Sequence, residues 1–274
     1  MNDQVQGWRE AAELGDAGAM CDLGVVYEEG DGVTKDLEEA ARWYRKASDL
    51  GDAVAMCNLG GMYAAGKGVS KDAEEAVRWY RKSADIGDAV AMCSLGSKYD
   101  TGEGVEKNAE EAVKWYRKSA DLGDAVAMFN LGVTYEIGEG VTKDAESAAE
   151  WYRKAADLGY ASAMCNLAGM YAKGEGVTMD EGEAVKWYRK AVDLQDAVAM
   201  FNLGLCYEAG IGVTQDLVEA CAWFTVAHEN GDASGHPNRQ VIEEHMATEQ
   251  IADVQKRSRE LLGELASASA KAKT

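Results

Sequence analysis

Tryptophan recurs every 36 residues through most of this chain, and no other feature restricts its fold as strongly. The residues are Trp43, Trp79, Trp115, Trp151, Trp187 and Trp223. With few departures, Ala-Met, Leu-Gly, Gly-x-Gly-Val and Trp-Tyr return at the same places in every unit. Self-similarity at such a period is typical of stacked helical repeats, each of which buries its apolar surface against its neighbours. We therefore predict an all-α protein, a right-handed α/α superhelical solenoid of helix–turn–helix repeats.

The unit from 53 to 88 shows how the first helix of a repeat, helix A, is specified. Asp52 precedes an apolar stretch and is predicted to be the N-cap. The apolar face has helical spacing and consists of Met56, Leu59, Gly60 and Tyr63. Gly66 and Gly68 then end the helix, because glycine adopts positive φ without steric cost.

Helix B of the same unit is predicted to begin after Asp72. Glu75 follows three residues later and is expected to complete a capping box. The pairs Asp36/Glu39, Asn108/Glu111, Asp180/Glu183 and Asp216/Glu219 repeat the device, whereas Asp144/Ser147 lacks the acidic second member. Trp79 and Tyr80 are expected to fill the space between repeats, and Gly87 ends the helix.

Three segments are predicted along the chain. Residues 1–16 hold a truncated helix B that acts as an N-terminal cap, and residues 17–232 hold six repeats. Residues 233–274 are expected to form two capping helices and a tail that is frayed from about Ala266.

The charge and the cysteines narrow the classes of function. The chain carries 28 basic and 48 acidic residues, a formal charge of −20, which disfavours binding to nucleic acid or to anionic membranes. No apolar run is long enough to cross a bilayer, and the N-terminus lacks the features of a signal peptide. Unless a leader was removed, we expect a cytoplasmic protein. Cys21, Cys57, Cys93 and Cys165 occupy one position of the repeat without a pairing pattern, so reduced thiols are expected, with a Cys206–Cys221 disulfide within the sixth repeat as the alternative.

These motifs resemble the Sel-one-like repeat (SLR) family, relatives of the tetratricopeptide repeats. The resemblance is carried by Ala55-Met56-x-x-Leu59-Gly60-x-x-Tyr63, by Gly66-x-Gly68-Val69 and by Ala76-x-x-Trp79-Tyr80-x-x-Ser83, with their copies over about residues 17–232. The segment 223–252 also resembles the C-terminal cap of bacterial members. The resemblance implies work as an adaptor or scaffold without one shared chemistry. Secreted members with two disulfide-bonded cysteines per repeat differ from this chain.

A second apolar stripe on helix A is the candidate binding surface. By analogy with tetratricopeptide repeats, it would line a concave groove with an acidic edge, suited to an apolar helix or peptide with basic flanks. The candidate partner-binding residues are Val54, Cys57, Gly61, Cys93, Ser97, Val126, Phe129, Val133, Ile137, Cys165, Gly169, Phe201, Leu205, Glu28, Asp100, Glu136 and Glu208. The alternative is that superhelical curvature buries this stripe between neighbouring A helices. Phe129 and Phe201 discriminate best, because each places a ring where other repeats have cysteine.

The remaining motifs do not indicate a catalytic or phosphate-binding site. The Gly-x-Gly-Val element joins two helices and does not follow a strand, as a phosphate-binding loop would. The three histidines, His228, His236 and His245, all lie near the C-terminus, so no catalytic pair with histidine forms in the preceding repeats. Arg-Lys pairs such as Arg45-Lys46 run along helix B and are expected to be neutralised by aspartates such as Asp49.

We thus predict a non-enzymatic scaffold that binds a protein or peptide, with no catalytic residues, no cofactor, no metal site, no nucleic acid and no membrane insertion. The alternatives are a self-assembling repeat protein and, least favoured, a hydrolase with a C-terminal site.

Overall fold

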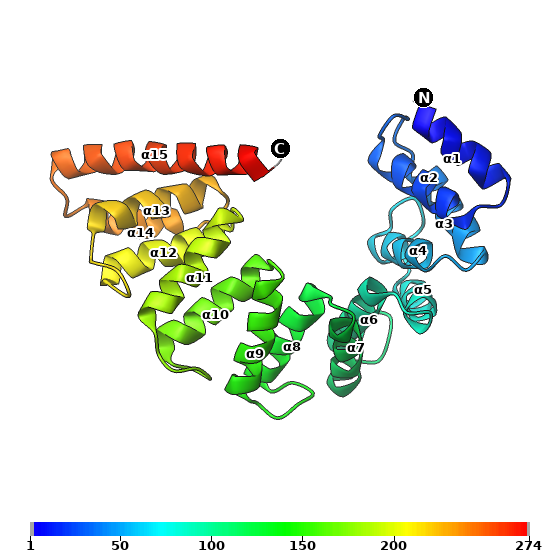
Figure 1. Ribbon diagram of the computed structural model, residues 1–274, viewed down its shortest axis with the longest axis horizontal. Helices are drawn as coiled ribbons and strands as arrows, with labels where there is room; N and C mark the ends of the chain where they lie inside the picture. The colour runs from blue at the N-terminus through cyan, green and yellow to red at the C-terminus, as the bar shows by residue number, and fades with distance from the viewer. Residues whose placement is uncertain (1–2, 273–274) are drawn as a thin grey trace. The chain divides into compact units, whose positions relative to one another are not determined.

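The computed structural model describes residues 3–272, which form helices and turns in two compact units (Figure 1). The first unit comprises Met1–Thr134 and Gly138–Thr142, and the second comprises Tyr135–Ile137 and Lys143–Thr274. The described residues contain helices and no strand, so the predicted all-α class of helix–turn–helix repeats is confirmed.

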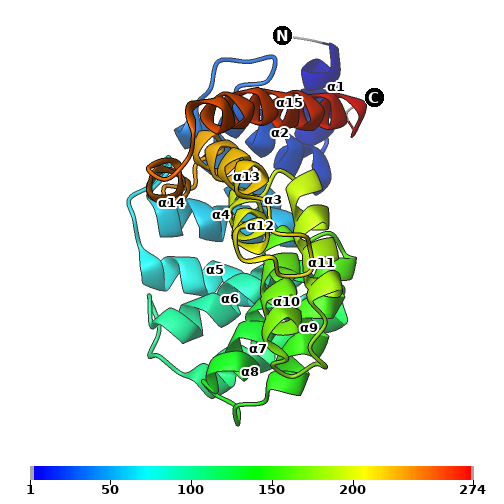
Figure 2. The same cartoon turned by 90° about the vertical axis from the view of Figure 1, so that its left-hand side faces the viewer.

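Each repeat contributes two helices of 13 residues. The helices begin with α1 (Asp3–Glu13), α2 (Ala17–Glu29), α3 (Leu37–Asp49), α4 (Ala53–Ala65), α5 (Ala73–Asp85), α6 (Ala89–Thr101), α7 (Ala109–Asp121) and α8 (Ala125–Ile137). They continue with α9 (Ala145–Asp157), α10 (Ala161–Lys173), α11 (Glu181–Asp193), α12 (Ala197–Ala209), α13 (Leu217–Glu229), α14 (Gly235–Glu243) and α15 (Thr248–Ala272). Within the first unit, α4 packs on α5 and α5 packs on α6 (Figure 2).

The ends of helix A form as the sequence predicts. Asp52 accepts a hydrogen bond from the Ala55 backbone N–H at 2.7 Å, and Gly66 ends α4 in the left-handed region at φ 68°. Gly68 has positive φ too, and a Cβ there would lie 2.0 Å from the Leu37 carbonyl oxygen of the preceding helix B. The Gly-x-Gly element therefore combines a helix stop with a close contact between repeats.

The capping box predicted for helix B forms only by half. Asp72 accepts from the Glu75 N–H at 3.0 Å, but the N–H of Asp72 donates to the Tyr63 carbonyl at the end of helix A. The Glu75 carboxylate instead pairs with Arg78 at 3.0 Å. The turn between the helices supplies the acceptor that the capping box would have supplied, so the glutamate is free to pair with the next basic residue.

Close packing of the two helices within a repeat depends on a glycine. A Cβ on Gly60 would lie 2.9 Å from the Tyr80 ring, so this glycine lets helices A and B approach closely. Trp79 is buried in the core cluster of the first and second repeats, and Trp115 is buried in the next cluster. The tryptophan of each of these B helices thus joins its repeat to the one before.

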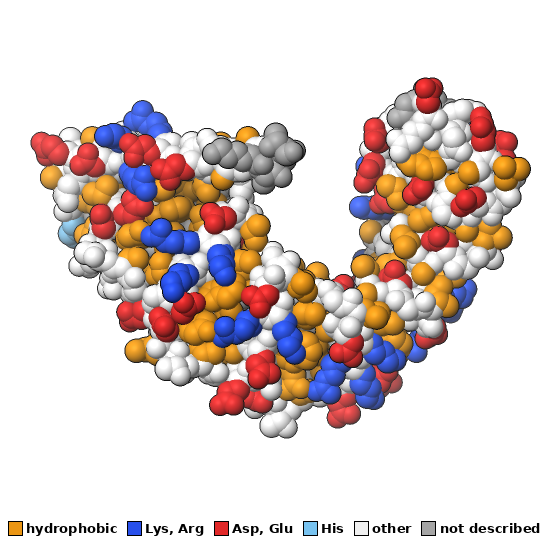
Figure 3. Space-filling model, viewed as in Figure 1, with side chains coloured by type: hydrophobic (Ala, Val, Ile, Leu, Met, Phe, Trp, Pro, Cys, Tyr) orange, Lys and Arg blue, Asp and Glu red, His pale blue; other side chains and the backbone are white. Residues whose placement is uncertain are grey.

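The basic pairs of helix B are not neutralised as predicted. Among the ion pairs of the described residues, none joins Arg45 or Lys46 to Asp49. Arg45 instead hydrogen-bonds to the Tyr63 hydroxyl of the next repeat and stacks on its ring, and Lys46 lies 3.9 Å from the Trp43 ring centroid. On the face of the second unit shown in Figure 3, basic side chains accordingly lie among apolar ones. These cations contact aromatic rings and not the predicted aspartates. Each exposed cation–π contact contributes about 0.5–1 kcal/mol.

The C-terminal helices pack on the last repeat, where α14 and α15 both contact α13. Val254 and Leu261 are the buried apolar residues of α15. The tail that was predicted to fray from Ala266 is helical to Ala272, where every second residue is alanine, the residue with the highest helix propensity.

Candidate functional site

The second stripe of helix A separates into an exposed row and a buried column. The exposed row, here called the valine row, is Val54, Val90 and Val126 in the first unit and Val198 in the second, with exposed fractions of 53%, 58%, 43% and 52%. Each valine follows directly after the start of its helix, where the N-cap fixes the backbone. The valine row is therefore apolar surface that a partner can reach.

The cysteine column was predicted to form part of the groove floor, and Cys57 and Cys93 each line a hollow on the helix-A face. Cys21, Cys57, Cys93 and Cys165 are all buried. Burial, together with the neighbouring Asp88, raises the pKa of the Cys57 thiol to about 12. The Cys165 thiol donates to the Asp196 carboxylate at 3.4 Å. These buried thiols are protonated packing groups, and all six cysteines are free, Cys206 and Cys221 included, in agreement with the expected reduced state.

The two phenylalanines of this column are both half-buried. In the second unit, the Phe201 ring lies 5.3 Å from the Phe224 ring. Phe201 and Leu205 pack against the cluster that contains Ile242 and Val254 of the C-terminal helices. Phe201 is thus a repacking residue of the last repeat, since its ring is engaged by α13 and the helices beyond it.

The remaining predicted residues lie on the same helices. Ser97 is exposed, whereas Gly61, Val133 and Gly169 are half-buried. Ile137, at the end of α8, is 57% exposed. The residues equivalent to Gly61 in the other repeats vary in size from glycine to leucine, so the space in front of helix A differs from repeat to repeat.

The acidic edge is partly engaged within the chain. Glu28 accepts a hydrogen bond from the Tyr44 hydroxyl at 3.0 Å, and Glu136 accepts one from Tyr152 at 2.5 Å. Burial is the main cause of the raised pKa of Asp100. Glu208 is half-buried.

Two adjoining hollows open on the helix-A face of the first unit. The larger, of about 430 Å³, is lined by Tyr80, Val90, Cys93, Ser94, Ser97, Lys98, Asp124, Val126 and Asn130. The smaller, of about 280 Å³, is lined by Glu28, Cys57, Asn58, Gly61, Met62, Lys67, Tyr80, Val90 and Ser94. Tyr80, Val90 and Ser94 belong to both, so the hollows meet at the second repeat. Part of the predicted surface is therefore open within this unit.

An amide row was missed by the sequence analysis. Asn58, Asn130, Asn166 and Asn202 recur with the period of the repeat, and Ser94 replaces them in the third repeat. All are half-buried, and Asn58, Ser94 and Asn130 line the two hollows. The period itself was the signal, because amides at a fixed helix-A position place hydrogen-bonding groups in line beside the valines.

The described residues contain no group of three or more His, Cys, Asp or Glu side chains that could hold a metal ion, although the rings of His228 and His236 lie 5.4 Å apart. None of the helices described is long and apolar enough to span a bilayer.

Comparison with known proteins identifies the repeats. The model of the Sel1 repeat matches six times, at 17–52, 53–88, 89–124, 125–160, 161–196 and 197–232. No curated protein matches the chain.

Solved structures give the same picture. A protective antigen of uropathogenic Escherichia coli with an SLR fold is 34% identical, with a TM-score of 0.81 over 94% of this chain, which spans 56% of that protein. A Sel1 repeat protein from Oxalobacter formigenes is 40% identical, with a TM-score of 0.75 over 78% of this chain and 88% of its own. The Cut9–Hcn1 hetero-tetramer of the APC/C matches at 15% identity, with a TM-score of 0.60 over 88% of this chain and 46% of that one, a likeness of fold alone. From its repeats and from these relatives, the chain belongs to the Sel1 repeat family.

Proposed function

We propose that this protein is a non-enzymatic scaffold that binds an apolar segment of a partner protein along the helix-A face. The observation that carries the proposal is the valine row, in which four equivalent valines are each at least 43% exposed. Val54, Val90 and Val126 come from three successive repeats of the first unit, and exposed apolar side chains on neighbouring helices provide a surface on which a helix or an extended peptide can bury its own apolar residues. In the first unit, Val90 and Val126 lie beside a hollow deep enough for a side chain.

The family supports an interaction role at a coarser level. Sel1 and related helical repeats generally act as protein–protein interaction scaffolds, and a likeness of fold extends to one subunit of a hetero-tetramer. For this chain we propose a partner with an apolar segment and basic flanks, since the carboxylate-bearing Glu28 lines the same hollow as Val90. We also propose that it works in the cytoplasm, where its six free cysteines stay reduced.

The self-assembly alternative has less support. Helix α15 packs on α13, and so covers surface on which a further repeat would stack. We therefore favour a single scaffold with a foreign partner.

The test compares two pairs of equally exposed apolar residues. The wild type, the Val90→Glu/Val126→Glu variant and the Ile86→Glu/Leu122→Glu control are used to capture proteins from the native host's lysate. Ile86 and Leu122 are 55% and 58% exposed but lie in the turns after helix B and line neither hollow. Circular dichroism first confirms that both variants are folded.

We expect one protein to be retained by the wild type and the control and lost from the valine variant. Retention of the same proteins by all three would contradict binding along the valine row.

A further inference from the structure

A contact between tyrosine and carboxylate recurs on the helix-A face. In the first repeat, the Tyr44 hydroxyl of helix B donates to Glu28, in the last turn of helix A, at 3.0 Å. In the fourth repeat, Tyr152 donates to the equivalent Glu136 at 2.5 Å. In these two repeats, the phenol thus donates to a carboxylate that approaches from the helix-A side.

The second repeat has the tyrosine but lacks the carboxylate. Ala64 stands at the position of Glu28 and Glu136. The Tyr80 hydroxyl lies over Gly61, where an added Cβ would be 3.6 Å from the phenol oxygen, and it lines both hollows. Among the hydrogen bonds of the described residues, none involves this hydroxyl. Burial raises the pKa of Tyr80 to about 12, so the group remains a donor at neutral pH.

A cation stands beside this donor in the second repeat. Lys67, in the loop after α4, lines the smaller hollow together with Tyr80. The equivalent residues of the other repeats are Asp31, Glu103, Glu139, Glu175 and Ile211, so Lys67 reverses the charge that is usual at this position. No ion pair of the described residues engages Lys67. Asn58 and Ser94 add further donors to the same lining.

One carboxylate also lines this hollow. Glu28 reaches it from the first repeat, where its carboxylate accepts the Tyr44 hydroxyl and keeps its negative charge. On the other side, Lys98 is held by Glu103 at 2.6 Å. No carboxylate of the described residues forms an ion pair with Lys67 or accepts from the Tyr80 hydroxyl, so that a cation and a neutral donor remain available in one hollow of about 280 Å³.

We propose that the hollow bounded by Asn58, Gly61, Lys67, Tyr80 and Ser94 is a carboxylate subsite that binds an acidic side chain of the partner. This inference rests on the proposed function, since the partner's apolar segment lies along the valine row and Val90 lines the same hollow. The incoming carboxylate takes the place against Tyr80 that Glu28 and Glu136 hold against their own tyrosines. Hydrogen bonds to a charged group are about twice as strong as neutral ones, so this subsite selects for an acidic residue within the apolar segment.

The fifth repeat is a built-in control. Tyr188 has Ala172 opposite it and Gly169 beneath it, where an added Cβ would lie 3.8 Å from the phenol oxygen. The position of Lys67 is held there by Glu175, whose charge repels a carboxylate. The same small residues and the same phenol, without the cation, should not form a subsite.

The experiment uses two short peptides that differ only in charge. N-acetyl-Val-Glu-Val-amide and N-acetyl-Val-Gln-Val-amide are each titrated, up to about 10 mM, into the ¹⁵N-labelled full chain. The backbone amide resonances of Asn58, Lys67 and Ser94 are followed by NMR. We expect the glutamate peptide to bind about tenfold more tightly than the glutamine peptide, with a difference that shrinks as salt is added.

Variants then assign the preference to the second repeat. Ala64→Glu supplies Tyr80 with an internal carboxylate, as in the first and fourth repeats, and Tyr80→Phe removes the donor; both should abolish the tenfold preference. Ala172→Glu, the matched change in the fifth repeat, should leave it intact. Circular dichroism checks that each variant is folded.

Three results would overturn the subsite. They are equal affinity of the two peptides for the wild type, no shift of these resonances with either peptide, and an undiminished preference in Ala64→Glu. Equal affinity with shifts at Val90 would leave the valine-row proposal standing, which is judged separately by loss of the captured protein.

Discussion

The B helices of the second and sixth repeats occupy equivalent places but face different surroundings. In α5, Glu75 pairs with Arg78 on the surface at 3.0 Å, and the Lys82 ammonium lies 4.0 Å from the Trp79 ring centroid. Each cation of this helix is in contact with water and covers an aromatic or acidic neighbour. Such contacts contribute little individually, because solvent competes for both partners.

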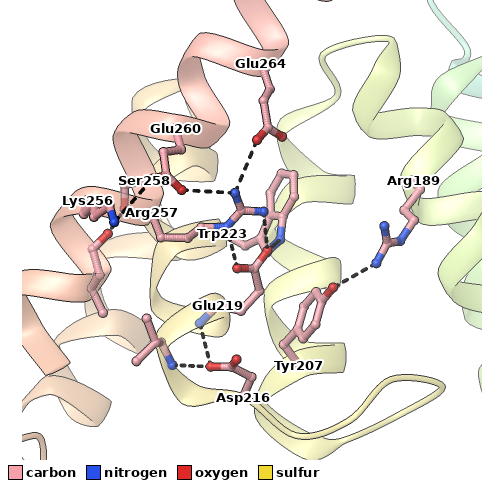
Figure 4. Close-up of polar contacts among 12 residues, drawn as sticks. Arg189, Tyr207, Asp216, Glu219, Trp223, Lys256, Arg257, Ser258, Glu260 and Glu264 are labelled. Carbon is pink, nitrogen blue, oxygen red and sulfur yellow. Dashed lines mark hydrogen bonds and ion pairs between the residues drawn. The ribbon is translucent and has the colours of Figure 1, made fainter.

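In α13, the same positions are used to hold the C-terminal helix. Ala222 replaces the basic residue, so Glu219 is free to accept from the Trp223 indole N–H at 3.0 Å and from Arg257 of α15 at 2.7 and 3.2 Å. Figure 4 shows the Arg257 guanidinium between Glu219, Glu260 and Glu264. Hydrogen bonding to Glu219 is the main reason that the pKa of Arg257 is raised.

The comparison shows that the repeat array ends through substitutions at a few positions of the last helix B, which otherwise keeps the form of the earlier ones. Val226, at the position of Lys82, is fully buried, and Thr225, at the position of Arg81, accepts from Arg239 of α14 at 3.3 Å. The exposed cations of the inner repeats are replaced where another helix covers them, because burying an unpaired charge costs several kcal/mol.

Exchanging the two helix-B residues should have the largest effect. Val226→Lys would place an ammonium group under the C-terminal helices and is expected to lower the free energy of unfolding by about 3 kcal/mol. The reciprocal Lys82→Val removes only one cation–π contact and should cost less than about 1 kcal/mol. Urea unfolding followed by circular dichroism measures both, and equal losses would show that the two positions do not differ in burial.

Removing the shared glutamate should have the next largest effect. Glu219→Ala leaves Arg257 and the Trp223 indole without their acceptor and is expected to cost about 2 kcal/mol. Glu75→Ala breaks an exposed pair and should cost about 0.5 kcal/mol. The same urea series tests the pair. If Glu219→Ala proved as mild as Glu75→Ala, the contact between α13 and α15 would not depend on this cluster.

Alkaline pH should act on the thiols of the cysteine column, a helix-A position that holds no thiol in the sixth repeat. The pKa of buried Cys93 is raised from 9.0 to about 12 by burial and by Asp124, whereas Phe201 stands at the equivalent place in the sixth repeat. Stability from the neutral thiol is complete below pH 9 and is lost as the pH rises toward 12, since the unfolded thiol ionises first.

At pH 10, each such thiol should therefore cost about 1 kcal/mol. The measurement compares the free energy of unfolding at pH 8 and pH 10 for the wild type and Cys93→Ala. The loss between the two pH values should be smaller in the variant by that amount; an identical loss would mean that this thiol is not the titrating group.

The smallest effect is expected at the turn that enters the sixth repeat. Gln195 adopts φ 62°, where equivalent turns such as Gly51 and Gly87 have glycine. Gln195→Gly should raise the free energy of unfolding by about 0.5–1 kcal/mol, because the left-handed region strains a residue with a Cβ. The control is Gly87→Gln, at φ 102°, which should destabilise by at least as much in the same assay.

Much of the candidate site followed from the period alone. The sequence placed Val54 and Cys57 on one stripe, but only packing decided that the valine is 53% exposed and the cysteine buried. Periodicity states which residues share a helix face, whereas burial depends on how closely the next helix approaches that face. Phe201 shows the same limit, since its ring packs on Phe224 beside the C-terminal cluster, a neighbour that no repeat pattern specifies.

Helix positions, caps and the stacking order were determined by the sequence itself. They depend on local chemistry that acts within a few residues, such as the Asp52 carboxylate on the Ala55 N–H, or on a period that copies one contact many times. The partner of each exposed charge was decided only by the tertiary structure. Arg45 takes Tyr63 and not Asp49, and Glu219 takes Arg257, 38 residues away. Flexible charged side chains have several partners within reach along one helix, and the one they take is fixed by which ring or carboxylate a neighbouring helix brings alongside.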